Sequence, residues 1–216
     1  MVTTLDTQCG EANARTNFLA KMESVRLERI PELYRDSDPS RLDPRIVSLC
    51  DEWKYAPKAK GIGFCGPTGL GKTRGIFRLL SRLMQEVQFS DRTGFALDAT
   101  FVNCRIINDA DFSHLVREFN SFSGAAVGAQ KKLKQLCDCD VLFIDDLGQG
   151  KMSDANCSEF YHLIETRTSC YRPIFFTTNF SAQDLAERFT NFTRGAAVVR
   201  RLTEFCEIFT LNDEEP

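Results

Sequence analysis

Eight consecutive residues in the first third of the chain have the types and spacing that hold a phosphate group. The segment Gly66-Pro67-Thr68-Gly69-Leu70-Gly71-Lys72-Thr73 matches the pattern G-x-x-x-x-G-K-[ST] at every position. Backbone N–H groups can wrap an anion only where side chains do not block them, which accounts for the three glycines. Lys72 supplies positive charge to the outer phosphates, and the Thr73 hydroxyl can ligate Mg²⁺. We therefore expect ATP with magnesium at this segment.

Two carboxylates follow an apolar run further along the chain. Asp145 and Asp146 come directly after Val141–Ile144, which is typical of a buried strand. In open α/β sheets, ligands bind at the carboxyl ends of the strands. Adjacent side chains on an extended chain point to opposite sides, so the two acids cannot do the same work. We expect Asp145 in the Mg²⁺ shell and Asp146 to polarise an attacking water.

Polar groups at two further positions could complete such a site. Asn179 ends a second strand-like run, Ile174–Thr178, and could hold the attacking water or contact the γ-phosphate. A later stretch with helical spacing of apolar residues carries Arg194, Arg200 and Arg201. Each arginine is either a solvated surface charge or a group that reaches into the nucleotide of a neighbouring subunit.

Strands and helices must bring these groups together. From Gly61 on, short apolar runs alternate with amphipathic helical stretches, which is typical of βα units and a parallel sheet. We expect strands at Gly61–Cys65, Phe101–Ile106, Val141–Asp145, Ile174–Thr178 and Phe205–Leu211. The fold class is α/β.

Two helices are well marked in this part of the chain. Lys72–Val87 has one apolar stripe, and a second face carries Arg74, Arg78 and Arg82, which we expect to be solvated. Asp154–Arg167 has the same helical spacing, with Asp154 as its expected N-cap.

The first sixty residues differ from the rest. Asn13–Arg29 has helical spacing, and three prolines then divide Ile30–Arg45 into turns. We therefore divide the chain into a short, mostly helical N-terminal arm at residues 1–58, a core at 59–212 and an acidic tail at 213–216.

Composition excludes several classes of protein. With 43% hydrophobic and 26% charged residues in 216, the chain can bury a core, which rules out a disordered or fibrous protein. The net charge of −3 provides no global basic field for nucleic acid, so any such contact must be local. The absence of a long apolar run and of a signal-like start favours a cytoplasmic protein. Nine cysteines without a C-x-x-C pair favour reduced thiols over a zinc site.

Taken in order, four blocks resemble the AAA+ ATPases of the DnaC/IstB group, which are replicative helicase loaders and transposase helpers. The blocks are Gly66–Thr73, Leu142–Gly148, Phe176–Asn179 and Val199–Leu202, and with the segment Ile30–Arg35 the resemblance covers about residues 28 to 211. It implies a P-loop NTPase with three αβα layers and a five-stranded parallel sheet. It also implies that Asn179 is sensor 1 and that Arg201 is a trans-acting arginine finger. Members of the group act as ATP-switched oligomers on single-stranded DNA.

The chain departs from the pattern in two places. Many AAA+ proteins have Asp-Glu where this chain has Asp145-Asp146, and the shorter second acid suits the loader group. No lysine or arginine follows Arg201, whereas family members usually carry a further arginine, sensor 2, that contacts the γ-phosphate in cis.

A local basic segment could provide the DNA contact. Lys131, Lys132 and Lys134 follow Arg117 and two aromatic residues, Phe119 and Phe122. A basic groove with aromatic platforms binds single strands without sequence preference, whereas an ordinary solvated helix would also carry these charges.

The resulting hypothesis is an ATP-hydrolysing helicase-loader-type protein, homo-oligomeric when ATP is bound, acting with a replicative helicase on single-stranded DNA. A transposase helper on duplex DNA would have the same chemistry. Two other classes stay open: a small-molecule kinase, although no acceptor pocket or arginine-bearing lid is visible, and an interaction protein that binds ATP with little turnover.

Overall fold

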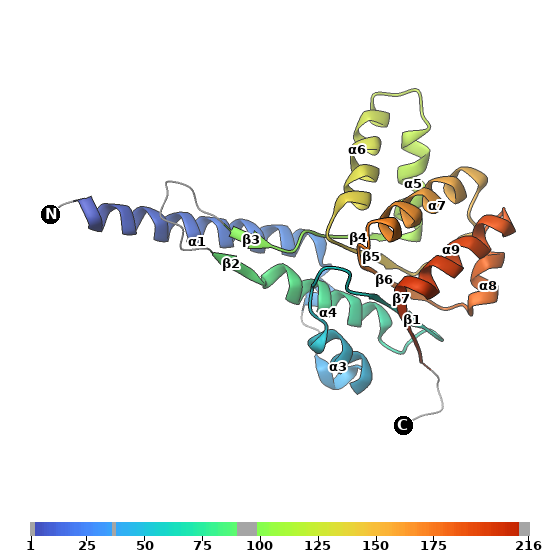
Figure 1. Ribbon diagram of the computed structural model, residues 1–216, viewed down its shortest axis with the longest axis horizontal. Helices are drawn as coiled ribbons and strands as arrows, with labels where there is room; N and C mark the ends of the chain where they lie inside the picture. The colour runs from blue at the N-terminus through green and yellow to red at the C-terminus, as the bar shows by residue number, and fades with distance from the viewer. Residues whose placement is uncertain (1–2, 36–37, 90–98, 212–216) are drawn as a thin grey trace.

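A parallel sheet of five strands forms the centre of the protein (Figure 1). The computed structural model describes residues 3–35, 38–89 and 99–211. The strands lie in the order β4-β5-β6-β1-β7, and every pairing is parallel. Their bounds are β1 Gly61–Cys65, β4 Cys104–Asn108, β5 Val141–Asp145, β6 Ile174–Thr178 and β7 Cys206–Thr210. A separate antiparallel ribbon joins β2 Val87–Phe89 to β3 Ala99–Phe101.

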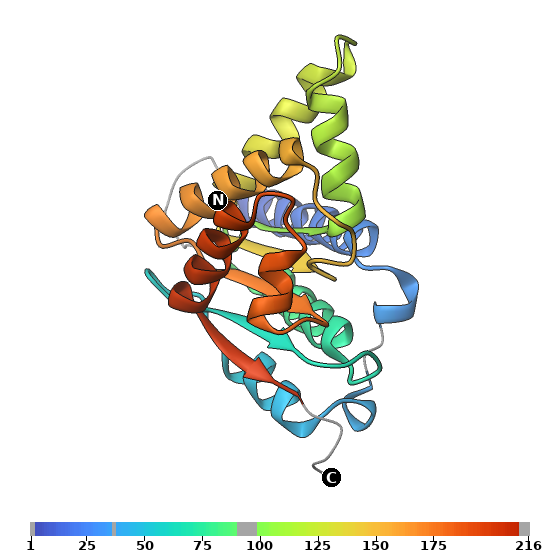
Figure 2. The ribbon, with the colours of Figure 1, turned by 90° about the vertical axis from the view of Figure 1, so that its right-hand side faces the viewer.

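Helices cover both faces of the sheet, which gives three layers (Figure 2). One face carries α1 Thr3–Arg29, α2 Glu32–Arg35, α3 Pro44–Glu52 and α4 Lys72–Gln85, with a 3₁₀ turn at Pro39–Arg41. The other carries α5 Asp109–Phe119, α6 Ala125–Asp138, α7 Asp154–Ser169, α8 Ala182–Glu187 and α9 Phe192–Phe205. Phe175 and Phe176 are both buried on β6 but belong to the cores on opposite faces, since side chains alternate along a strand. The three-layer α/β fold expected from the sequence is confirmed.

The arginines of α4 are partly exposed and are bonded to the N-terminal segment, whereas the sequence pattern predicted a solvated face. Arg78 pairs with Asp51 of α3 at 2.8 Å, and Arg74 donates to the carbonyl of Leu33. Arg82 donates to carbonyls at the C-terminal end of α3, those of Cys50 and Trp53. These bonds fasten the segment that contains α2 and α3 along α4. The partners lie 27 to 41 residues upstream, so helical periodicity alone could not reveal them.

Several predicted boundaries need correction. Helix α1 begins at Thr3 and not at Asn13, and Phe205 ends α9 instead of starting the last strand. The helix that begins at Lys72 ends at Gln85, and Val87 starts β2 instead of extending the helix. The predicted strand Phe101–Ile106 is divided, because Phe101 pairs with Val87 in the ribbon whereas the central sheet begins at Cys104. The N-cap of α7 is Ser153, whose side chain accepts from the backbone N–H of Asn156, and Asp154 is the first residue of the helix.

A fully buried arginine joins elements near the edge where the strands begin. Arg167 of α7 has no exposed surface, and its guanidinium donates to the carbonyls of Leu136, Cys139 and Pro173 at 2.8–2.9 Å. Leu136 is in the last turn of α6, where unpaired carbonyls and the helix dipole favour a cation. Burial lowers the pKa of Arg167. The bonds to carbonyls offset the cost of burying its charge.

Two parts of the molecule project from the layers (Figures 1 and 2). The first is α1, whose Phe18 contacts Phe89 and Phe101 of the ribbon. The second is the α5–α6 hairpin, with Phe122 fully exposed at its tip. No described helix is both long and apolar enough to cross a membrane. The arm and core boundaries at residue 58 stay predictions, and the acidic tail at 213–216 lies outside the described residues.

Candidate nucleotide site

The segment Gly66–Thr73 forms a loop from the end of β1 to the first residues of α4. Gly66 has φ +137°, and a Cβ there would lie 2.2 Å from the carbonyl oxygen of Leu211. Gly71 has φ +81°, and its Cβ would lie 2.8 Å from the side chain of Leu42, which precedes α3. Only glycine fits either position. The loop is therefore enclosed by the end of β7 on one side and by the N-terminal segment on the other.

Lys72 lies inside this loop. The residue is 5% exposed, and its ammonium donates to the carbonyl of Gly66 at 2.8 Å and to that of Pro67. Lys72 is also the first residue of α4, where free backbone N–H groups favour an anion. A positive group held across a glycine-rich turn at a helix N-terminus suits a phosphate.

Oxygen ligands for a cation meet beside the loop. The Thr73 hydroxyl donates to Asp145 Oδ1 at 3.0 Å, and the Thr177 hydroxyl donates to the same oxygen at 2.7 Å. Asp145 is 9% exposed. Burial raises its pKa, and the nearby charge of Asp146 acts in the same direction, against the bonds from the two threonines. A hydroxyl and a carboxylate in contact are hard oxygen ligands that fit Mg²⁺.

Asp146 has an unusual backbone conformation. Its φ of +54° is in the left-handed region, and its N–H donates to the Thr177 hydroxyl at 2.8 Å. The loop that follows is held by Arg188, which donates to the carbonyls of Gly148 and Gln149 at 2.8 Å each. The Asp146 N–H and the Asp145 carboxylate thus both contact the Thr177 hydroxyl, and the different roles predicted for the two acids stay predictions.

The sequence analysis missed a third acid at this edge of the sheet. Asp109 follows β4, is 4% exposed, and accepts from the Gly150 N–H at 2.7 Å. Burial raises its pKa, and the charge of Asp146 adds to this effect. Asp109 thus anchors the far end of the loop that begins at Asp146. Its position directly after a strand, the same signal that singled out Asp145, could have found it.

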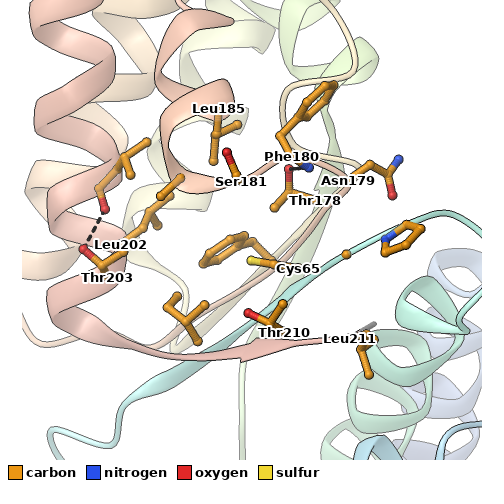
Figure 3. Close-up of a pocket in the computed structure, with 16 residues that line it drawn as sticks. Cys65, Thr178, Asn179, Phe180, Ser181, Leu185, Leu202, Thr203, Thr210 and Leu211 are labelled. Atoms are coloured by element: carbon orange, nitrogen blue, oxygen red, sulfur yellow. Dashed lines mark hydrogen bonds between the residues drawn. The ribbon is translucent and has the colours of Figure 1, made fainter. Parts of the chain in front are cut away.

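Asn179 directly follows β6 and lies at the margin of a cavity of about 490 Å³ next to Gly66 and Pro67 (Figure 3). The cavity lies between α8, α9 and the strands β1 and β7, and its lining is mainly apolar. The preceding residue, Thr178, donates to the carbonyl of Leu147 at 2.8 Å. The structure thus brings Gly66–Thr73, Asp145, Asp146 and Asn179 to the same edge of the sheet.

Arg201 is not part of this assembly. It lies one turn before the end of α9, which leads directly into β7, and Cys206 of β7 pairs with Gly61 at the start of β1. The residue is therefore near the edge where the strands begin, and the phosphate loop lies where they end. Its guanidinium contacts Glu165 of α7. Of the other two arginines, Arg194 donates to Ser158 and Arg200 is exposed.

The basic residues proposed for DNA contact lie on the projecting hairpin. Lys131, Lys132 and Lys134 are exposed on α6, and Phe122 is exposed at the tip. Phe119 instead packs against the core, so it is not free to stack on a base.

Comparisons with known proteins agree with this geometry. A sequence model for the family described as IstB-like ATP binding protein matches residues 11–215. The replicative helicase loader DnaI of Bacillus subtilis (strain 168) is 28% identical over 163 residues, 74% of this chain and 46% of that protein. The chain thus spans about half the length of this curated relative.

Solved structures share the fold. A crystal structure of DnaI has a TM-score of 0.62 at 21% identity, covering 85% of this chain and 95% of that one. A crystal structure of the DnaC helicase loader has a TM-score of 0.61 at 19% identity, covering 84% and 100%. AMPPCP-bound DnaA from Aquifex aeolicus has a TM-score of 0.56 at 14% identity, covering 78% and 44%.

Proposed function

The chain belongs to the family of IstB-like ATP-binding proteins, with an AAA+ fold, and from that premise we propose that it hydrolyses ATP to load or remodel a replicative helicase on single-stranded DNA. The observation that carries the proposal is the meeting of Thr73, Asp145 and Asp146 beside a phosphate loop. The helicase partner and the DNA come from the similarity to the loaders DnaI and DnaC. The exposed lysines of α6 support a local DNA contact.

The arrangement divides the work of hydrolysis among the residues of the site. Lys72 and the loop N–H groups hold the phosphates, and Thr73 with Asp145 holds Mg²⁺, which neutralises developing negative charge. Asp146 polarises the attacking water and takes its proton, and Asn179 orients the same water. Arg201 supplies positive charge to the nucleotide of a neighbouring subunit.

Two alternatives share parts of this chemistry. A transposase helper would use the same site on duplex DNA, in keeping with the name of the family. An ATP-binding switch with little turnover would use the same phosphate loop without the hydrolytic step. A comparison of ATP turnover with single-stranded and duplex DNA separates all three.

The test is phosphate release from Mg-ATP with no DNA, with single-stranded DNA and with duplex DNA. We expect single-stranded DNA to increase the rate of phosphate release. The double variant Lys131→Gln/Lys134→Gln should keep the basal rate and lose the increase.

Lys72→Ala should fold normally and bind ATP at least about 100-fold more weakly by titration calorimetry, because it loses the positive charge that contacts the phosphates. Unchanged ATP affinity in Lys72→Ala would contradict the assignment of the loop, and a rate that responds only to duplex DNA would favour the transposase helper.

A further inference from the structure

We propose that Glu165 is a positioning residue for Arg201, which it holds so that the free edge of the guanidinium meets the triphosphate bound to a second copy of this chain. The inference rests on the proposed ATPase function. It adds a residue that neither the motifs nor the sequence pattern identifies.

The contact between the two side chains has a specific geometry. Arg201 Nε donates to Glu165 Oε2 at 3.1 Å, and Arg201 Nη2 donates to Glu165 Oε1 at 2.9 Å. A guanidinium has five N–H donors, and this pairing uses the edge formed by Nε and Nη2. The opposite edge, formed by Nη1 and the second hydrogen of Nη2, donates no hydrogen bond to any described residue. The free edge can donate two hydrogen bonds to phosphate oxygens in a bidentate arrangement.

Glu204 does not close the free edge. Its Oε2 lies 3.8 Å from Arg201 Nη1, which is too long for a hydrogen bond, and its side chain is 59% exposed. Glu165 is the better anchor because it is on a different helix, α7, and its side chain is only 34% exposed. The orientation of Arg201 therefore depends mainly on Glu165.

The position of the pair excludes a role in its own subunit. Val199 and Leu202 of α9 line the cavity beside the phosphate loop, whereas Arg201 points across to α7. Both helices end near the edge where the strands begin, and the loop lies at the opposite edge. A triphosphate that Arg201 contacts must belong to another subunit.

Holding the side chain matters because arginine is flexible. A free arginine loses much rotamer freedom when it is fixed at a phosphate, and a carboxylate that fixes it beforehand reduces this loss. The two side chains are about one-third exposed, 30% and 34%, so the pair contributes little to folding stability. Loss of Glu165 should thus affect turnover far more than folding.

The first part of the test measures steady-state ATP hydrolysis by full-length variants that assemble. We expect Glu165→Ala to lower kcat about tenfold or more with KM for ATP within about twofold of wild type, because a misplaced group costs rate without affecting binding in the neighbouring site. Glu165→Gln, which keeps one acceptor oxygen, should lie between Glu165→Ala and wild type. Glu204→Gln is the matched control and should keep kcat within about twofold.

The second part identifies the side of the interface on which Glu165 acts. Asp146→Asn and Arg201→Ala fail on opposite sides, so a mixture of the two inactive proteins should recover turnover. Glu165→Ala mixed with Asp146→Asn should recover in the same way. Glu165→Ala mixed with Arg201→Ala should not, because both changes affect the same side.

The outcomes separate this inference from the function on which it rests. If wild type releases no phosphate, the proposed function fails and the inference with it. If wild type assembles and hydrolyses ATP but the Asp146→Asn and Arg201→Ala mixture stays inactive, Arg201 does not act in a neighbouring site, and the inference fails while the ATPase function stands. If that mixture recovers but Glu165→Ala keeps wild-type kcat, or exceeds it, only the positioning role is wrong. Recovery of ATP turnover in the mixture of Glu165→Ala with Arg201→Ala would also overturn the positioning role of Glu165.

Discussion

Ionisation of Asp145 costs the fold free energy. Its carboxylate is buried next to Asp146, and both burial and the neighbouring charge raise its pKa above the usual value for an aspartate. Hydrogen bonds from Thr73 and Thr177 offset only part of this effect. A cation bound beside this buried carboxylate would compensate its unfavourable charge.

Asp145→Asn should therefore stabilise the protein in the absence of nucleotide. A carboxylate with a raised folded-state pKa contributes stability below its unfolded pKa and loses that contribution as pH rises through the folded pKa. The amide has no charge to bury, so the variant should melt roughly 2–4 °C higher than wild type at pH 7, and the difference should shrink toward pH 4. Calorimetric melting across this pH range measures the difference.

Asp145→Asn should also lose Mg²⁺-dependent ATP binding, whereas Asp146→Asn should still bind Mg-ATP and hydrolyse it much more slowly.

A melting difference that does not change with pH would refute the electrostatic explanation. If Asp145→Asn and Asp146→Asn showed the same binding defect, the separate roles given to the two acids would be wrong.

Some functional and structural residues could be found in the sequence and others could not. The loop at Gly66–Thr73 depends on contiguous backbone N–H groups, so the residues that it needs are adjacent in the sequence and form a recognisable motif. Arg167 interacts with carbonyls of Leu136 and Pro173, which any residue would provide, and so its burial leaves no local pattern. Glu165 was missed for a different reason, because its partner Arg201 is on another helix, 36 residues further along the chain.

Helix α4 is the element that connects the phosphate loop to the N-terminal segment. At its second turn, a Cβ on Gly75 would lie 2.4 Å from Cγ2 of Ile46 in α3, and the Cys50 thiol donates to the Gly75 carbonyl at 3.3 Å. Close packing of the two helices depends on the missing side chain. The same segment places Leu42 against Gly71 in the loop.

Gly75→Ala should destabilise the protein although alanine is the better helix former. The gain in helix propensity is about 1 kcal/mol, and the overpacking against Ile46 costs about 1–3 kcal/mol, so we expect a net loss in the free energy of unfolding. Gly128→Ala is the matched control in α6, since its Cβ would meet nothing within 4 Å, and it should gain about 0.5–1 kcal/mol. Urea denaturation of both variants measures the difference. Stabilisation by both substitutions would disprove the tight contact between α3 and α4.

Element type was easier to predict than element boundaries. Strands β1, β5 and β6 have the predicted bounds because each is a short apolar run with polar groups or glycine beside it. The segment around Phe101 was assigned to one strand because its residues are apolar on both sides of Asn103, but two different partners divide it. Pairing partners are a property of the assembled sheet.

At the scale of the molecule, the two halves of the proposed catalytic interface lie at opposite edges of the sheet. The phosphate loop is where the strands end, and Arg201 is near where they begin. Contact between unlike surfaces is heterologous and does not close after two subunits, so it gives rings or helical filaments.

ATP with Mg²⁺ should therefore convert the protein to assemblies larger than dimers. We expect light scattering after size-exclusion chromatography to show this for wild type, and more persistently for Asp146→Asn, which keeps its nucleotide. Lys72→Ala should show no such change. A closed dimer as the only ATP-dependent species would argue against the placement of Arg201 in a neighbouring site.

The order of the strands also has a consequence for how the protein is made. Strand β1 lies between β6 and β7, the last two strands of the chain, and Gly66 N–H donates to the carbonyl of Thr178. While the ribosome is still synthesising the second half, the apolar side chains of Ile62 and Phe64 have no neighbouring strand, for roughly 10–30 s at usual elongation rates. The nascent chain cannot form its nucleotide site until Leu211 has emerged, because Leu211 N–H donates to the carbonyl of Cys65. Only a polypeptide synthesised at least as far as Leu211 can respond to ATP, and until then β1 is an exposed segment for a chaperone to protect.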